Sequence, residues 1–509
     1  MIRLYFLLVA SCAAVDQCPS ATSPPPCSSG CAVADCLDAS DLGDDAVRAA
    51  VDRARRPLLI RGLVPRIVGE GSAAAAWTPE ALADRWGDFE VVTQSNAVVG
   101  LGLSAWDLQA GWGAAVEEVK EPLRSYLGRA ASTASGSANG SAIDGALVPP
   151  VLFVNSESHP ALLAKVQALP SVAMPPFSMA ADKRHYALLS VGGSAAGLPL
   201  HSHGDAWLAQ LHGSKSWWFL PPSADLAALP PALYRALFVQ PASAWASSLL
   251  GADDCTGGGG RCPQRCDFGA GDTVVIPRGW HHSTANTGGG VGVALGGQRF
   301  GGALSPDMYD ELVQEAEDLV AAAGGGAHTP ARTAVQNDPY TQSVVSRKLL
   351  LLAHALEERT EKGAGDDARL QRGRNLATEL IRRSAAAHPL HLELARAAIA
   401  ALLDVGALLD AYGALHRLSQ QLNACFQEGL LSSTVVLALL ADMAEPWHRR
   451  THPGAIMEHG NDAEWWLLGA KTSGLPFWLK GVYATALRRM PAHVAAKAGM
   501  QLWDDQFSS

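Results

Sequence analysis

The sequence lacks the features that define several large classes of protein. No cluster of lysine and arginine stands out and the net charge is −10, which disfavours nucleic acid or an anionic membrane surface as the primary partner. Beyond the N-terminal stretch, no apolar run approaches the ~18 residues that span a bilayer, so we expect no transmembrane segment. The 50 glycines follow no fixed repeat, which argues against collagen-like order.

The features that are present point to a lumenal or secreted chain with several parts. At 509 residues and 48% hydrophobic, the chain is long enough for two or more domains. Arg3 precedes an apolar stretch that ends in small residues, which predicts a signal peptide over residues 1–14. A buried first strand and a bacterial lipoprotein site at Cys12 are the alternatives. The signal predicts the secretory pathway, with the mature chain in the endoplasmic reticulum lumen or secreted.

Cysteine usage fits such an oxidising compartment. Removal of Cys12 with the signal leaves eight of the nine cysteines, an even number. No C-x-x-C pair occurs, so disulfide bonds are favoured over a structural zinc site. Cys425 stands alone, as a long-range partner or as a buried thiol. The others gather in a Cys/Pro-rich lead-in over residues 15–40 and before the histidine pair at 281–282: Cys18, Cys27, Cys31, Cys36, Cys255, Cys262 and Cys266.

The rest of the chain divides into a β-rich part and a helical part. Short β runs separated by Gly, Pro and Ser predict a barrel or sandwich within a domain over residues 41–302. This domain carries a low-complexity insertion at 128–150, where Asn139 begins a glycosylation pattern. Residues 303–509 show helical periodicity, and this helical region is the candidate surface for a homo-oligomer or a partner contact.

Two histidine motifs predict a metal site. In LHSHGDAWLAQLHGSK, His201 and His203 stand two residues apart, so both can face the same side of one strand. In GDTVVIPRGWHHSTAN, His282 begins a strand after a tight turn and is the natural third ligand. Three protein ligands leave positions for a substrate, a cosubstrate or dioxygen, as in non-haem iron oxygenases.

The neighbours of these histidines suggest a ligand for the site. Thr284 and Asn286 share the strand face of His282 and can line the same cavity, whereas His281 would point to the opposite face. Lys215 lies just past a glycine turn on the strand after the first motif, where its ammonium can pair with the distal carboxylate of a small dicarboxylate. The alternative for this residue is a solvated turn lysine.

In this order, the motifs resemble those of the JmjC-domain family, cupin-type oxygenases that depend on Fe(II) and 2-oxoglutarate. LSVGGSAAGLPLHSH resembles the family's first-histidine strand, LHGSKSWWFLPP its G-x-K-x-W-x-x-x-P-P segment, and CDFGAGDTVVIPRGWHHSTAN its G-[DE]-x-x-x-x-P-x-x-W-x-H segment. All three lie within residues 57–302, and the helical region is outside them. The H-x-H form, the glycine after it and the predicted signal resemble most closely the lumenal Jumonji domain-containing protein 8 type.

The resemblance implies a fold and a chemistry. The fold would be a mainly β core, a double-stranded β-helix or jelly roll of the cupin-like JmjC type, with flanking helices and an α-helical C-terminal region. His201, His203 and His282 would hold Fe(II), and Lys215 would bind the cosubstrate 2-oxoglutarate, with no catalytic residue beyond the metal centre. The function implied is a dioxygenase that hydroxylates a protein substrate in the secretory pathway.

Two departures from the family pattern keep alternatives open. His203 stands where most active members carry Asp or Glu, and Asp205, which makes an H-x-D triplet with His203, is an alternative ligand. Leu198 replaces the hydroxyl-bearing residue expected three positions before the first histidine. The rival predictions are therefore a catalytically inactive JmjC-fold scaffold or binding protein, and a plain cupin-like protein that binds zinc or nickel.

Overall fold

The structure, a computed structural model, describes a β core and the helices around it. The described residues are mainly 34–69, 74–93, 119–136, 151–169, 185–249, 262–299, 309–322 and 364–431, with short gaps in some ranges and isolated residues elsewhere. The predicted signal peptide and Asn139 lie outside them, as do Cys18, Cys27 and Cys255. Within this described part, no helix is long and apolar enough to cross a membrane.

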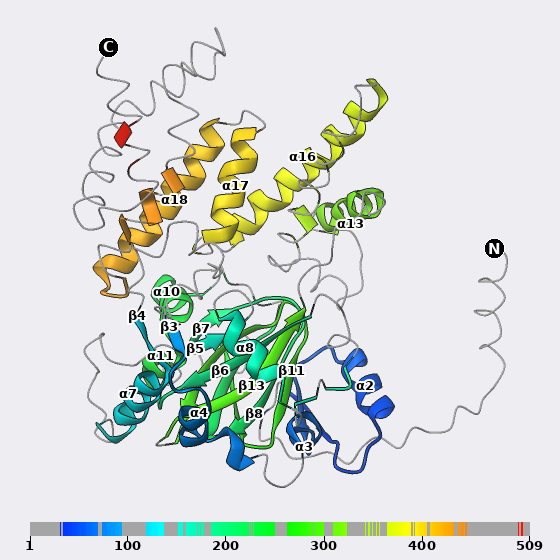
Figure 1. The fold of residues 1–509 in the computed structure, drawn as a ribbon. Coiled ribbons are helices and arrows are strands. Elements are labelled where there is room, and N and C mark those ends of the chain that lie inside the picture. Colours follow the sequence, from blue (N-terminus) through cyan, green and yellow to red (C-terminus); the bar gives the residue numbers. More distant parts are fainter. Residues whose placement is uncertain are drawn as a thin grey trace, which may run out of the picture.

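Two sheets form the β core (Figure 1). The larger is mixed, because its first two strands pair in parallel and the rest are antiparallel. In spatial order its seven strands are β1 (Asp35–Asp38), β2 (Leu58–Arg61), β11 (Thr273–Ile276), β8 (Ala206–His212), β13 (Gly292–Arg299), β6 (His185–Gly192) and β5 (Leu152–Val154).

The smaller sheet has four antiparallel strands and carries most of the predicted site. In spatial order they are β10 (Gln264–Gly269), β9 (Ser214–Leu220), β12 (His281–Thr287) and β7 (Gly197–His201). A separate antiparallel pair consists of β3 (Glu90–Thr93) and β4 (Val119–Pro122). The structure thus confirms the predicted β core, and the β runs around the two histidine motifs are all strands.

Helices surround this core and make up the described part of the C-terminal region. Those that flank the sheets are α2 (Asp44–Arg53), α3 (Val64–Val68), the 3₁₀ turn η1 (Ala74–Trp77), α4 (Pro79–Trp86), α7 (Leu123–Gly136), α8 (Pro160–Gln167), α10 (Pro231–Val239) and α11 (Ala242–Leu249). Those of the C-terminal region are α13 (Tyr309–Ala322), α16 (Ala364–Ala387), α17 (Leu392–Asp404) and α18 (Leu408–Gln427). The predicted helical half of the chain is therefore confirmed where it is described.

Two of the predicted segments contain regular elements that the sequence analysis did not predict. The Cys/Pro-rich lead-in contains a strand, β1, which adds to the edge of the larger sheet beside β2. The low-complexity insertion at 128–150 begins within α7, which continues to Gly136 because Tyr126 and Leu127 anchor that helix in the core. Sequence reading missed both elements because alanine, serine and cysteine mark flexible segments as readily as short regular ones.

Each face of the smaller sheet is buried by a different layer. The inner face carries Trp217 and Phe219, which pack in one cluster with Leu59 and Val274 of the larger sheet. The outer face carries Trp218, Leu220 and Leu200, which pack in a second cluster with α10, α11, α17 and α18. Burial on both faces explains why β9 reads as an almost continuous apolar run, SWWFL, rather than as an alternating strand.

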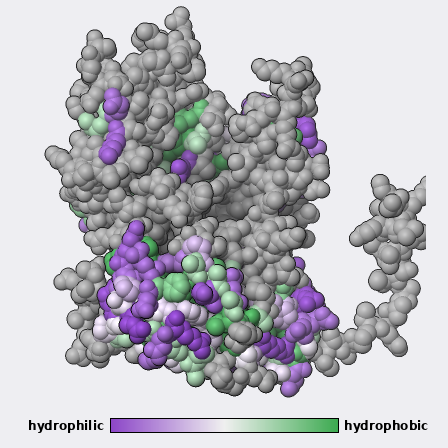
Figure 2. All heavy atoms as spheres, in the orientation of Figure 1, coloured by the Kyte–Doolittle hydropathy of each residue, from purple (hydrophilic) through white to green (hydrophobic). Residues whose placement is uncertain are grey.

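The second cluster joins the two predicted parts of the chain. Residues from 390 to 444 share one hydrophobic core with the outer face of the smaller sheet, so the packing does not break at residue 302. Cys425 lies in this core as a buried free thiol, the second of its two predicted states. In Figure 2, the coloured surface of the β core is mixed, with hydrophilic areas on both sides of a smaller hydrophobic one.

Disulfide bonds are present, as the cysteine count predicts. Cys31 and Cys266 are bonded, with their Cα atoms 5.1 Å apart, so the N-terminal segment is tied to the edge strand β10. Cys36 and Cys262 are also in disulfide bonds. Cys31 and Cys266 are both buried in the cluster between the two sheets.

Candidate metal centre

The structure brings the three predicted histidines together. His201 ends β7 and His282 lies near the start of β12, and the two are direct partners in the antiparallel register. His203 follows in the loop after β7. The ring centroids lie 4.3 Å apart for His201 and His282, and 4.6 Å apart for His203 and His282. One ligand nitrogen from each ring lies within 4.8 Å of the others, a spacing that can hold a metal ion.

Backbone carbonyls orient all three rings. The Nδ1 atoms of His201 and His203 lie 2.8 Å from the carbonyl oxygens of Pro199 and Gly204. The Nδ1 atom of His282 lies 2.9 Å from the carbonyl of Trp280. Because a carbonyl can only accept, each Nδ1 carries the proton, and each Nε2 presents a lone pair.

The Nε2 atoms of His203 and His282 are close enough that a cation between them would be favourable. They are 3.1 Å apart. With both Nδ1 atoms protonated, neither Nε2 can donate to the other, so two lone pairs face each other. A metal ion between them would remove this conflict, and a proton is the other species that could do so.

Burial argues against the proton. Desolvation lowers the pKa of His282 well below its usual value, and the neighbouring rings of His201 and His203 lower it further. Desolvation also lowers the pKa of His203. Histidines that stay neutral at physiological pH keep their lone pairs for a metal.

Asp205, the alternative ligand, has another role in the structure. Its Oδ1 accepts a hydrogen bond from the backbone N–H of Arg278 at 2.9 Å, and the N–H of Gly279 donates to the carbonyl of His203 at 3.2 Å. These two bonds tie the loop that carries His203 to the turn that leads into His282. Asp205 lies outside the group of three histidines that can share an ion.

Lys215 is a buried cation on the same inner face. It is 4% exposed and is the direct register partner of Asn286, while Phe219, four residues further along β9, is the partner of His282. Desolvation lowers the pKa of its ammonium to about 8. Because Lys215 is buried, the alternative of a solvated turn lysine is wrong. No described carboxylate forms an ion pair with it. A buried ammonium without a partner indicates a place for an anion.

Asn286, which was predicted to line the cavity beside His282, has its side-chain donors bound within the protein. Its Nδ2 donates to the carbonyls of Gly192 and Gly193 at 2.7 and 3.2 Å, so its donors are used within the protein. Its Oδ1 is buried and has no hydrogen-bond partner. An acceptor cannot bind a carboxylate, but it can accept a bond from the ammonium of Lys215 across the strands. Asn286 is thus the register neighbour of Lys215 and has an unused acceptor, with no bond between the two in the structure.

Thr284 places a hydroxyl beside Leu198, the residue at the position where the resemblance leads us to expect a hydroxyl. Leu198, which stands at the position of the missing hydroxyl, is the direct partner of Thr284 in the register of β7 and β12. The backbone N–H of Leu198 donates to Thr284 Oγ1 at 3.3 Å, which leaves the hydroxyl hydrogen of Thr284 to act as a donor. Thr284 is buried and lies between the rows of His282 and Asn286.

An aromatic wall, which was not predicted from the sequence, borders the histidines. The ring of Trp217 lies 5.7 Å from that of His282, stacks on Phe219 with an angle of 11° between the planes, and meets Phe268 edge-on. Cys266, half of the disulfide, is the register partner of Trp217. The available signal was the two-residue spacing of Lys215, Trp217 and Phe219 along β9, which places them on one face.

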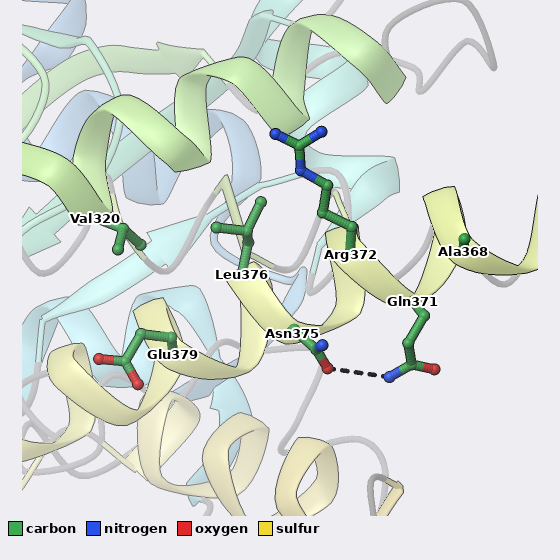
Figure 3. A pocket seen from close by; sticks show the side chains of 7 residues that line it. All are labelled: Val320, Ala368, Gln371, Arg372, Asn375, Leu376 and Glu379. Atoms are coloured by element: carbon green, nitrogen blue, oxygen red, sulfur yellow. Dashed lines mark hydrogen bonds between the residues drawn. The ribbon is translucent and has the colours of Figure 1, made fainter.

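A groove elsewhere in the molecule carries no comparable chemistry. It lies between α13 and α16, is about 560 Å³ in volume, and is shown in Figure 3. Its polar groups form bonds within the protein: Gln371 donates to Asn375 at 3.0 Å, and Glu379 pairs at 2.7 Å with Arg383, which does not line the groove. The histidine cluster is therefore the candidate functional site.

The role of Asp205 can be tested by two substitutions. Asp205→Ala removes the acceptor that holds the turn before His282, and we expect the affinity for Co(II) to fall on the order of tenfold. Asp205→Asn keeps an oxygen acceptor for the N–H of Arg278, so its affinity should stay near that of the wild type. Titration of the metal-free protein with Co(II), followed by visible absorption, gives both values. Loss of binding in Asp205→Asn would instead mean that the carboxylate is a ligand.

Comparison with known proteins adds no family assignment. No protein-family model matches the chain, and no curated protein matches it. The interpretation of the site therefore depends on its own geometry, and the resemblance of the motifs to the JmjC family stays a prediction.

Proposed function

We propose that the chain is an Fe(II)- and 2-oxoglutarate-dependent dioxygenase of the JmjC type, whose two sheets form a double-stranded β-helix. We further propose that it hydroxylates a protein substrate in the secretory pathway. The observation that carries the proposal is the combination of three convergent histidine Nε2 atoms with a buried, unpaired Lys215 on one sheet face. A metal and an organic anion bound together would satisfy both groups.

The residues fit the two absent groups by the chemistry of their donors. Three neutral imidazole nitrogens suit Fe(II) among other divalent metals, and they leave coordination positions open. The Lys215 ammonium suits a distal carboxylate. Iron with 2-oxoglutarate would supply the oxidation, in which one atom of dioxygen enters a substrate C–H bond and the other ends in succinate as carbon dioxide is released.

The protein's own contribution is to bind, orient and exclude water. Lys215 and Thr284 would hold the far end of the cosubstrate, and Asn286 would steer the ammonium. Trp217 and its aromatic neighbours keep the space beside His282 apolar. His201 and His203 are only half-buried, whereas His282 is buried, so the substrate would approach from the side of the first two histidines.

The location and the class of substrate have separate support. The disulfide between Cys31 and Cys266 fits the oxidising compartment that the predicted signal peptide requires. Protein side chains are among the substrates implied by the family resemblance. His201 and His203, the half-buried pair at the end of β7 and in the loop after it, would be accessible to a side chain presented by another protein.

A second function, a catalytically inactive scaffold or binding protein, is favoured by one specific observation. The group that can hold a metal contains no carboxylate, and Asp205 is engaged by the turn at Arg278 instead. Such a site would offer less charge compensation to Fe(II) than a site with one carboxylate. It could bind zinc or nickel, or serve only as a folded module for a partner.

Metal analysis and succinate release separate these functions. Protein isolated without added metal should contain about one iron per chain and release succinate from 2-oxoglutarate, because the site offers both ligands. His201→Ala should lose metal and turnover, and Lys215→Ala should keep metal but lose turnover. His416→Ala and Lys165→Ala, which change exposed residues of the same types, are the matched controls. Zinc or nickel with no succinate would support the second function instead.

Binding of 2-oxoglutarate should also depend on pH. The pKa of Lys215 is lowered to about 8, so raising the pH through that value neutralises the ammonium and removes its attraction for a carboxylate. We expect the dissociation constant to rise roughly tenfold per pH unit above that pKa. Lys215→Arg keeps its charge, so its constant should stay level between pH 7 and 9. Calorimetry with 2-oxoglutarate and Co(II) measures this, and a flat profile for the wild type would contradict the role of Lys215.

A further inference from the structure

The outer face of the smaller sheet, opposite the three histidines, is also buried, and it packs against α10. Alternation along β12 turns His281 to the side opposite His282, as predicted, and His281 is 1% exposed. The ring of Phe238, from α10, meets the ring of His281 edge-on, with centroids 6.1 Å apart and an angle of 86°. Leu200, next to His201, is fully buried in the same cluster as Phe238. The strands that carry His201 and His282, β7 and β12, thus both pack against α10.

Helix α10 is in turn held by the C-terminal region. Figure 1 shows α10 between the sheets and α18. The backbone N–H of Leu390 donates to the hydroxyl of Tyr234 at 3.2 Å, and the ring of Tyr234 lies 4.9 Å from that of Phe238. Arg235 forms a two-bond ion pair with Glu428, just after α18, in which Nε donates to the carboxylate at 2.7 Å. The contacts run without a break from the C-terminal helices to His281.

The ion pair between Arg235 and Glu428 differs from the other pairs of the surface. Only 11% of the Arg235 side chain is exposed, and Gln421 adds a third acceptor for its guanidinium. A bidentate pair that is mostly shielded from water has a fixed geometry and contributes more than an exposed pair. It fixes the position of α18 relative to α10 where the two parts of the chain meet.

We infer that the C-terminal helical region positions the metal ligand His282 through Phe238 and His281, so that its docking on α10 sets the affinity of the site for metal. The backbone of β12 joins His281 to His282, and a close-packed interior transmits a displacement of one to the other. Ligand orientation controls metal affinity, and loss of a supporting contact weakens it by one to two orders of magnitude. The inference rests on the metal site of the proposed function and is independent of its 2-oxoglutarate chemistry.

The test compares metal affinity with stability in the full-length protein. Phe238→Ala removes the contact behind His281, and we expect its dissociation constant for Co(II) to rise about tenfold. Tyr309→Ala is the control, because Tyr309 is a fully buried aromatic residue of α13 whose cluster contains only C-terminal residues. It should lower the melting temperature while leaving the Co(II) dissociation constant unchanged.

A charge exchange covers the case in which Phe238→Ala does not fold. Arg235→Glu and Glu428→Arg should each weaken Co(II) binding several-fold, and the double variant, which restores an ion pair of reversed polarity, should recover most of it. Folded variants whose constants all lie within twofold of the wild type would overturn the inference, as would a wild-type protein that binds no Co(II). Wild-type metal binding without succinate release would reject the oxygenase and leave the inference intact.

Discussion

The alternation of side chains across the smaller sheet is the constraint on which the rest of the structure depends. Pairing of β12 between β7 and β9 fixes which residues face inward, and every group of the candidate site except His203, which lies in the loop after β7, follows from that register. His282, Thr284 and Asn286 face the space between the sheets, while His281 faces the helices. A shift of one residue would exchange the two sets, so the same pairing that builds the core also builds the metal centre.

Charge explains how the parts of the site depend on one another. Three neutral histidines and a buried ammonium supply no negative charge, and no carboxylate belongs to the cluster. A divalent metal would add two positive charges beside the Lys215 charge in a poorly solvated space. A dicarboxylate that bridges the metal and Lys215 offsets two of these three charges, so each ligand would favour the binding of the other. Under the proposed function, the H-x-H sequence would thus shift charge compensation from the protein to the cosubstrate.

Much of this arrangement could be predicted from sequence, because it depends on local periodicity. The spacing of His201 and His203, the turn before His282 and the position of Lys215 all follow from strand and turn signals. The contacts that depend on distant segments could not be predicted. Two of them join residues far apart in the sequence, namely the bond from Arg278 to Asp205 and the packing of Phe238 on His281. The burial of Lys215 depends on the packing of the whole sheet. The sequence of the helical region gave no sign that this region packs behind the sheet that carries the histidines.

The most direct measurement of the central claim is a crystal structure of the protein with Co(II) and 2-oxoglutarate, with anomalous diffraction collected at the cobalt edge. The account predicts one anomalous peak bound by the Nε2 atoms of His201, His203 and His282, with the distal carboxylate of 2-oxoglutarate against the Lys215 ammonium. A peak bound through Asp205 or through Nδ1 would contradict it. So would full metal occupancy with the carboxylate placed away from Lys215.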